Sequence, residues 1–239
     1  MRWRLFHLNW RYGVGELAIV VAGVLIAFAV ERWNSDRLDR DEEMQIIGRL
    51  TADLQVDLEQ IAFGLERISY KKARLLRIHS SLEAANERPE DMRRFLTDVV
   101  ESATYGWNQA RARRTTFDDV VASGKFGLLR DTTVRAMISD YYDREMGAHN
   151  RIEERETEYS NLSYRLIPRD AEFELATDLS DDQIDRLVDR VYSSSLPDHV
   201  VGELNFTQFL AEQFEEWRGR CLELIDELET YQNSIGRAR

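Results

Sequence analysis

Cysteine, proline and glycine are scarce in this chain of 239 residues, which contains one cysteine, three prolines and twelve glycines. The single cysteine, Cys221, excludes an internal disulfide and a metal site built from several thiolates. Because Cys221 stands near Trp217, Leu222, Leu224 and Ile225, we expect it to be a small buried side chain. The alternative is an intermolecular disulfide. The scarcity of helix-breaking residues, beside abundant leucine, alanine, glutamate and arginine, favours helices over strands.

Basic residues are outnumbered by acidic residues, 32 to 44, and the formal net charge is −12. Such a chain is unsuited to nucleic acid, because binding to the phosphate backbone requires a basic face. The charge is also unevenly distributed, since residues 1–12 contain Arg2, Arg4 and Arg11 and no acidic residue. A short basic head before a long acidic body is typical of an anchored protein.

Residue patterns for catalysis or metal binding are also missing. The four histidines are scattered, and no two of them are spaced to bind a metal from one helix. Asp53 and Asp57 lie one helical turn apart, as in half of a di-metal carboxylate site, but no Glu-x-x-His motif accompanies them. We therefore interpret both as part of a solvated helix face. The sequence predicts no catalytic residue, no metal and no cofactor.

One long apolar run, GELAIVVAGVLIAFAVERW at residues 15–33, lies near the start of the chain. The fourteen residues from Leu17 to Val30 carry no charge. Extension of the run back to Gly13 gives eighteen residues with a single charged side chain, that of Glu16. Eighteen helical residues span about 27 Å, close to the thickness of the hydrocarbon core. Aromatic residues suited to the two interfaces flank the run: Trp10, Tyr12 and Trp33. The pattern predicts a transmembrane helix over residues 13–33.

The two alternatives to a membrane span are a cleaved signal peptide and a buried core helix. Ala27-Phe28-Ala29 has the small-x-small form of a signal-peptidase site, after a basic region and an apolar region. Against cleavage, Glu16 interrupts the junction of these regions, and the apolar periodicity resumes soon after Trp33. A buried core helix is less favoured, because it would not need aromatic residues at both ends.

The orientation of the predicted span follows from its short tail. Lys and Arg are nearly balanced on the two sides, but a long acidic body can be translocated whatever its charge. We therefore expect residues 1–12 to form a cytoplasmic tail, residues 13–33 to cross the cytoplasmic membrane once, and residues 34–239 to form an extracytoplasmic helical domain.

Glu16, Gly23 and Ala27 would share one face of this helix, since they are spaced by seven and four residues. Gly23 and Ala27 form a small-xxx-small pair that permits two helices to approach closely in a membrane. On that seam the carboxylate of Glu16 would bind a partner's donor or carry a proton. The alternative is that Glu16 lies at headgroup depth and helps the helix begin.

The body begins with a long amphipathic helix. Its apolar residues recur at intervals of three and four: Ile47, Leu50, Leu54, Leu58, Ile61, Leu65 and Ile68. The stripe is typical of a coiled coil or of the first helix in a bundle. We predict partner contacts through Leu50, Leu54, Leu58, Ile61 and Leu65.

Shorter helices follow, each with a recognisable start or end. Pro89 is placed to open one helix, and Thr115-x-x-Asp118 to start another. Gly124 suits a left-handed helix end, and Asp131 is placed to cap the next helix.

The last third of the chain has similar signals. Ser180 and Gln183 have the spacing of a capping box, Pro197 and Gly202 bracket a predicted turn, and a last helix is predicted from about Asn205. Because no strand pattern appears, the fold class is all-α: one transmembrane helix continuing into the long amphipathic helix, then an antiparallel bundle.

Three arginines, Arg111, Arg113 and Arg114, form a basic cluster in the acidic body, close to Trp107. Such a cluster usually pairs with nearby carboxylates. The alternative is a ligand site, in which Trp107, Arg111 and Arg114 would contact an anion.

Two segments together resemble a bacterial domain-of-unknown-function family of uncharacterised single-span membrane proteins. The first carries the family's anchor pattern at Gly15-Glu16, Gly23, Ile26-Ala27 and Trp33-Asn34. The second is similar to its internal segment at Ser123, Gly124 and Lys125. The resemblance implies an anchored helical protein of the bacterial inner membrane, makes Glu16 part of a family pattern, and supplies no catalytic residues.

Together these patterns predict a non-enzymatic scaffold, self-assembling component or accessory subunit of a membrane complex. Its partners would be membrane lipid and either further copies of the chain or another membrane protein. The alternative functions are an extracytoplasmic ligand-sensing bundle that signals through a partner, and a membrane-anchored hydrolase, for which the sequence shows no site.

Overall fold

The computed structural model describes residues 10–84, 88–103, 111–153, 157–170, 172 and 174–237, and the side chains of these residues except at 10–15 and 146–153. The described residues form seven α-helices and one 3-10 helix: α1 (Trp10–Glu83), α2 (Met92–Ser102), α3 (Thr115–Ala122), η2 (Lys125–Leu128), α4 (Thr132–Glu153), α5 (Glu158–Leu166), α6 (Asp181–Tyr192) and α7 (Leu196–Arg237). Among them there is no strand, only an isolated antiparallel bridge between Arg169 and Leu175. The predicted all-helical fold class is confirmed.

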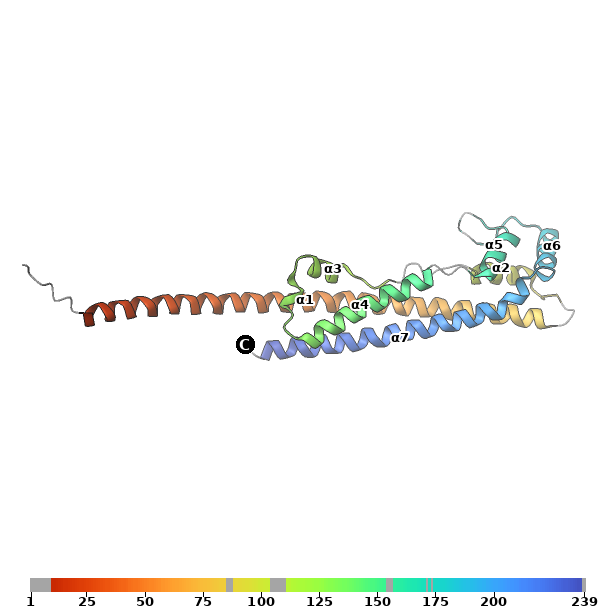
Figure 1. Ribbon diagram of the computed structural model, residues 1–239. Helices are drawn as coiled ribbons and strands as arrows, with labels where there is room; N and C mark the ends of the chain where they lie inside the picture. The colour runs from red at the N-terminus through yellow and green to blue at the C-terminus, as the bar shows by residue number, and fades with distance from the viewer. Residues whose placement is uncertain are drawn as a thin grey trace, which may run out of the picture.

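Two long antiparallel helices, α1 and α7, give the molecule the shape of a rod (Figure 1). Helix α4 lies along them, and α2, α5 and α6 gather at the end of the rod where α1 ends and α7 begins. Helix α1 runs without a break through the apolar run and into the amphipathic stretch. Its first part projects alone beyond the body.

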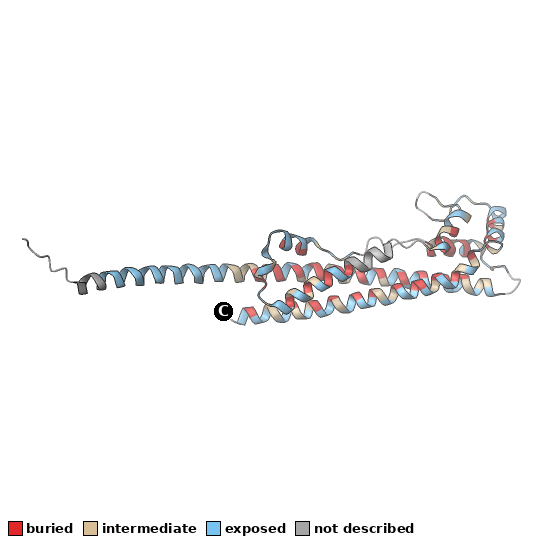
Figure 2. Ribbon diagram, in the orientation of Figure 1, coloured by how far each residue is buried: buried red, intermediate tan, exposed pale blue. Residues whose placement is uncertain are grey.

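The main core lies between α1, α4 and α7, with α3 at its side. The predicted stripe of α1 supplies it: Ile47, Leu50, Leu54, Ile61 and Ile68 are at most 2% exposed, and Leu58 and Leu65 pack against them. Figure 2 shows this as a line of buried residues that begins well after the start of α1. The periodicity of the sequence therefore located the core face of α1 correctly.

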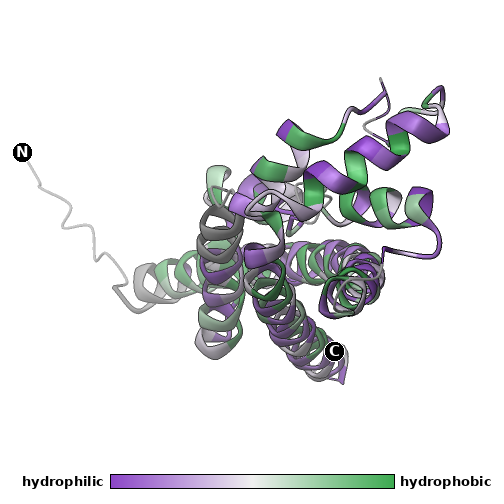
Figure 3. Cartoon of the chain, turned by 90° about the vertical axis from the view of Figure 1, so that its right-hand side faces the viewer, coloured by the Kyte–Doolittle hydropathy of each residue, from purple (hydrophilic) through white to green (hydrophobic). Residues whose placement is uncertain are grey.

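A second core joins α2, α5 and α6 to the adjoining ends of α1 and α7. Ile184, Leu187, Val188 and Val191 form the buried face of α6, because they recur at three- and four-residue intervals. The view along the rod shows these short helices standing to one side of it, with hydrophilic residues on their outer faces (Figure 3).

Several predicted helix signals have the expected geometry. Gly124 has a φ of 71°, the left-handed conformation that glycine adopts without a steric penalty. Asp131 caps α4, since its Oδ1 accepts a hydrogen bond from the Thr133 amide at 2.7 Å. The capping box of α6 is also present, with the Ser180 amide donating to Gln183 Oε1 at 2.8 Å.

Other predicted boundaries were wrong. Helix α7 begins at Leu196 rather than near Asn205, so Pro197 lies in its first turn, where the missing amide costs nothing. Helix α2 is capped by Asp91, whose side chain accepts from the Arg94 amide at 2.9 Å, rather than opened by Pro89. For α2 the chain thus uses a start signal, Asp91, that the sequence contains but that the nearby proline obscured.

Gly64 fixes how closely α1 and α7 approach. A Cβ atom built on Gly64 would overlap the ring of Phe214 on α7, whereas one built on Gly48 would meet no atom within 4 Å. At Gly64 the edge of the Phe214 ring fills the space that a side chain would take, and this packing offsets the low helix propensity of glycine.

We expect Gly64→Ala to lower the free energy of unfolding by about 1–3 kcal/mol, because the added methyl displaces a buried ring. Gly48→Ala is the matched control, and we expect it to raise that free energy by about 0.5–1 kcal/mol through helix propensity alone. Urea unfolding followed by circular dichroism measures both. Equal stabilisation by the two changes would contradict the close packing at Gly64.

Candidate functional site

The apolar part of α1, Leu17–Val30, projects from the body. All residues from Glu16 to Leu38 are exposed (Figure 2). The exposed fractions of Leu17, Ile19, Leu25, Ile26 and Phe28 are between 62% and 75%. Within the part of the chain that the structure describes, no helix is both long enough and apolar enough to cross a membrane.

The residues of the predicted membrane seam lie on this projecting segment. Glu16, Gly23 and Ala27 are all exposed, and a Cβ atom on Gly23 would meet nothing within 4 Å. Within the single chain no described segment covers them, so the seam remains a prediction about other molecules.

The stripe predicted to contact a partner lies inside the main core of the same chain. Leu50, Leu54 and Ile61 are at most 1% exposed, and they belong to one core with α7 and α4. The helix that covers this stripe is therefore α7 of the same chain, and Leu58 and Leu65 at its edges pack into that core too. Leu58 and Leu65 remain partly exposed, and contact of this stripe with a second protein stays a prediction.

The second feature is a pair of buried carboxylates on α1. Asp53 and Asp57, interpreted from the sequence as solvated, are only 7% and 0% exposed. Asp57 Oδ1 accepts the amide of Arg113 at 2.7 Å, and Asp53 Oδ2 accepts the amide of Thr116 at 3.0 Å. The interpretation was wrong because the segment before α3 folds back over this face and presents its amides to it.

This contact also explains how α3 begins. The residue that precedes α3, Arg114, makes no capping hydrogen bond with its side chain. The Thr116 amide in the first turn is instead satisfied by Asp53, a residue 63 positions away. The predicted start signal at Thr115 and Asp118 thus gives way to a cap supplied by α1.

Asp57 is further linked to two aromatic side chains. Its Oδ2 accepts the Tyr141 hydroxyl at 2.7 Å, and that hydroxyl in turn accepts the indole N–H of Trp217 at 2.9 Å. One chain of hydrogen bonds therefore joins α1, α4 and α7 through their shared core. Cys221 lies beside it, fully buried as expected, with its thiol 3.3 Å from the Leu54 carbonyl oxygen.

A third carboxylate of α1, Glu43, repeats this arrangement nearer the apolar segment. Glu43 is 1% exposed and accepts the Arg130 amide at 2.7 Å. The Tyr231 hydroxyl of α7 donates to Glu43 and accepts the Asp131 amide at 3.1 Å. Three acids along α1 thus hold the backbone of residues 113–131 at both ends.

Burial changes the acidity of these groups. Desolvation raises the pKa of Asp57 from 3.8 to about 6, although the hydrogen bonds from Tyr141 and Arg113 oppose the rise. Burial also raises the pKa of the Cys221 thiol to about 12 and that of the Tyr141 phenol further above its usual range. Both oxygens of Asp57 are occupied by donors of the chain, so the arrangement suits a structural link rather than catalysis.

The arginine cluster pairs with carboxylates and aromatic rings, as arginines of acidic proteins usually do. Arg113 Nε lies 3.0 Å from Asp53 Oδ1, and Arg114 lies 3.2 Å from Asp118 and over the ring of Phe117. Arg111 is exposed, and Trp107 lies outside the described residues. Among the described residues, no group of three or more His, Cys, Asp or Glu side chains is placed to hold a metal ion.

The comparisons with known proteins yield a family. Residues 16–155 match the family of unknown function DUF6090, and this is more than half of the chain, which therefore belongs to that family. The match includes the projecting segment and the buried acids of α1, and it ends before α5. Comparison with curated proteins gives no significant match. Comparison with solved structures gives none either.

The raised pKa of Asp57 predicts a specific pH dependence of stability. The folded chain binds this proton more tightly than the unfolded chain, so the free energy of unfolding falls as pH rises from about 4 to about 6, by up to about 3 kcal/mol. We expect Asp57→Asn to flatten the profile over this interval, because the amide oxygen still accepts from Arg113 but does not titrate.

Urea unfolding at closely spaced pH values measures this effect. Asp140→Asn is the control, since Asp140 is exposed and pairs only across one helical turn with Arg144. The pKa of buried Glu145 is raised as well, mainly by desolvation and in smaller part by the charge of Asp57, so most of its contribution persists in both variants. Parallel profiles for the wild-type protein and Asp57→Asn would contradict the assignment.

Proposed function

We propose that this member of the DUF6090 family is a membrane-anchored helical scaffold, which acts as a self-assembling component or accessory subunit of a complex in the bacterial inner membrane. Residues 13–33 would be the anchor, residues 1–12 would lie inside, and the helical body would lie on the extracytoplasmic side. The observation that carries the proposal is the projecting segment of α1, which is apolar and uncovered on all its faces.

The all-round apolar character favours lipid over a single protein partner. In a two-helix contact one stripe is apolar and the other faces are polar, as in the part of α1 that α7 covers. In Leu17–Val30, by contrast, every position is apolar or glycine. A helix of this kind is stable only where apolar material surrounds it, as acyl chains do.

The length of the segment bears on how it would lie in a bilayer. The fourteen uncharged residues measure about 21 Å, less than the roughly 30 Å of a hydrocarbon core. The proposal therefore includes residues 13–15 at one end and the interfacial ring of Trp33 at the other. A short span is accommodated by local thinning of the bilayer or by oligomerisation, and the second route suits the Gly23 and Ala27 seam.

The body supports a role in contacts rather than in chemistry. The buried acids of α1 are engaged by amides and hydroxyls of the chain itself, as in the contacts of Asp57 with Arg113 and Tyr141. These contacts hold α3 and α4 on the same helix that carries the apolar segment. Whatever binds the body is thus attached to the anchor through one continuous helix.

The anchor is tested by Val24→Arg, placed at the middle of the apolar segment. Val24 is 48% exposed on a part of α1 that projects from the body, so the body is expected to remain folded. An arginine at the centre of a span costs about 2.5–3.5 kcal/mol on insertion scales, so we expect the protein to shift from the carbonate-washed membrane fraction to the supernatant.

Val201→Arg is the matched control, because Val201 is 50% exposed but lies on α7 of the body. We expect this variant to stay with the membranes like the wild-type protein. Recovery of the unaltered protein in the supernatant, or equal retention of both variants in the membrane fraction, would overturn the anchor.

Assembly through the seam is tested by Gly23→Ile. We expect the bulky side chain to separate helices that meet at Gly23 and Ala27, which raises the monomer share at least tenfold in native mass spectra from mild neutral detergent. The monomer is recognised by its mass of 28.0 kDa. Gly219→Ile on α7 is the control, since a Cβ atom there also meets nothing within 4 Å. An unchanged oligomer in Gly23→Ile would mean that the seam is wrong.

A further inference from the structure

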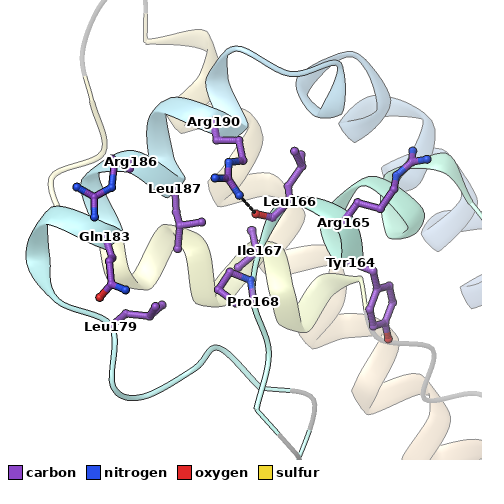
Figure 4. Close-up of a pocket in the computed structure, with 10 residues that line it drawn as sticks. All are labelled: Tyr164, Arg165, Leu166, Ile167, Pro168, Leu179, Gln183, Arg186, Leu187 and Arg190. Carbon is purple, nitrogen blue, oxygen red and sulfur yellow. Dashed lines mark hydrogen bonds between the residues drawn. The ribbon is translucent and has the colours of Figure 1, made fainter.

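A cavity of about 420 Å³ lies between the C-terminal end of α5 and helix α6 (Figure 4). It is at the end of the rod opposite the apolar segment, in the group of short helices formed by α2, α5 and α6. Residues 164–168 form one wall, α6 forms the other, and Leu179 lies at the side. This region lies beyond the residues that match the family.

The charge of the cavity is opposite to that of the chain. Three arginines, Arg165, Arg186 and Arg190, line it, and no acidic residue does so among the described lining residues. In the whole chain acidic residues exceed basic ones by twelve. A local concentration of guanidinium groups in such a chain attracts anions selectively to this one place.

Two acids of helix α6 pair with an arginine that does not line the cavity. Asp185 Oδ1 accepts from Arg88 at 2.9 Å, and Asp189 accepts from the same guanidinium. Arg186 and Arg190 are one turn apart on the face that lines the cavity. The acids nearest in sequence are therefore already engaged by Arg88.

The guanidinium groups differ in how many donors they retain. Arg186 is exposed and has no hydrogen bond or ion pair with any described residue. Arg190 donates Nη1 to the Leu166 carbonyl at 3.3 Å, as Figure 4 shows, and its other N–H groups remain available. Arg165 pairs with Glu158 at 2.8 Å, so it is partly neutralised.

The rest of the lining is apolar. Ile167 is 1% exposed and Leu187 is 6% exposed, and Leu166 and Leu179 are half-buried beside them. Leu187 lies on α6 between Arg186 and Arg190. A ligand that pairs with the guanidinium groups would thus bring any attached apolar body onto this floor, which is the usual composition of a small-molecule site.

We propose that this cavity binds a small anion with an apolar body, a phosphate or carboxylate attached to a ring or short chain. Arg186 and Arg190 bind the anionic group through charge-assisted hydrogen bonds, and Leu187 with Leu179 contacts the apolar part. This site is separate from the anchor, since about 70 Å of α1 lies between Val30 and Ile78 at the second core. The inference holds whether or not the apolar segment enters a membrane.

The test is isothermal titration of the full-length protein, in neutral detergent, with phenyl phosphate as the probe. We expect saturable binding of phenyl phosphate, weaker binding of inorganic phosphate, and none of phenol. Arg186→Gln and Arg190→Gln are each expected to weaken binding about tenfold, the loss of one charge-assisted hydrogen bond. Arg218→Gln, an exposed arginine of α7 that pairs with Glu215, is expected to change nothing.

A second arm distinguishes a soluble ligand from a lipid headgroup. This arm titrates the protein with a short-chain anionic phospholipid dispersed in the same detergent, because the apolar segment would carry every variant onto vesicles. Binding of that lipid that depends on Arg186 supports the site with a headgroup as ligand, whereas binding of phenyl phosphate alone supports it with a soluble ligand. If neither probe binds, or if Arg186→Gln, Arg190→Gln and Arg218→Gln bind phenyl phosphate equally, the proposal is overturned. All three arginines are exposed, so the variants are expected to fold, and circular dichroism verifies this.

Discussion

Helix α1 depends in the body on α7 to cover its apolar stripe, because the stability of a protein helix comes mainly from the packing of its apolar face. The antiparallel contact with α7 supplies that cover along most of the body. Gly64 brings the two backbones close at Phe214, and the buried ion pair of Lys71 and Glu203 adds a polar contact further along. Every shorter helix packs on this pair, so the arrangement of α2 to α6 depends on it.

The buried acids of α1 accept hydrogen bonds from backbone amides, whereas its apolar stripe packs in the core. Residues 111–131 contain only short helical segments, and buried backbone amides in such a connection need acceptors. Glu43, Asp53 and Asp57 provide them, at intervals that place all three on the side facing this connection. Desolvation makes these carboxylates costly to bury, and the hydrogen bonds that they accept offset part of that cost.

Hydrophobic periodicity and local turn and capping signals predicted the features that depend on residues close together in the sequence. The stripe from Ile47 to Ile68, the turn at Gly124 and the cap at Asp131 all followed from spacing or from the conformational preference of one residue. The buried role of Asp57 did not, because its partners are 56 and 84 residues away. A carboxylate beside an apolar stripe looks the same in sequence whether water or a distant amide binds it. The cavity at α6 was missed for the same reason, since its two walls come from separate segments.

The hydrogen bond between Tyr231 and Glu43 fixes where the last turns of α7 lie along α1. Between this level and the apolar segment, residues 31–38 are exposed helix, about 12 Å long, that carries both acidic and basic side chains and contacts the body through the ion pair of Asp36 with Arg130. This stretch acts as a spacer of set length. It holds the helical body away from whatever surrounds Leu17–Val30, and leaves a gap whose height is set by the register of α1 and α7.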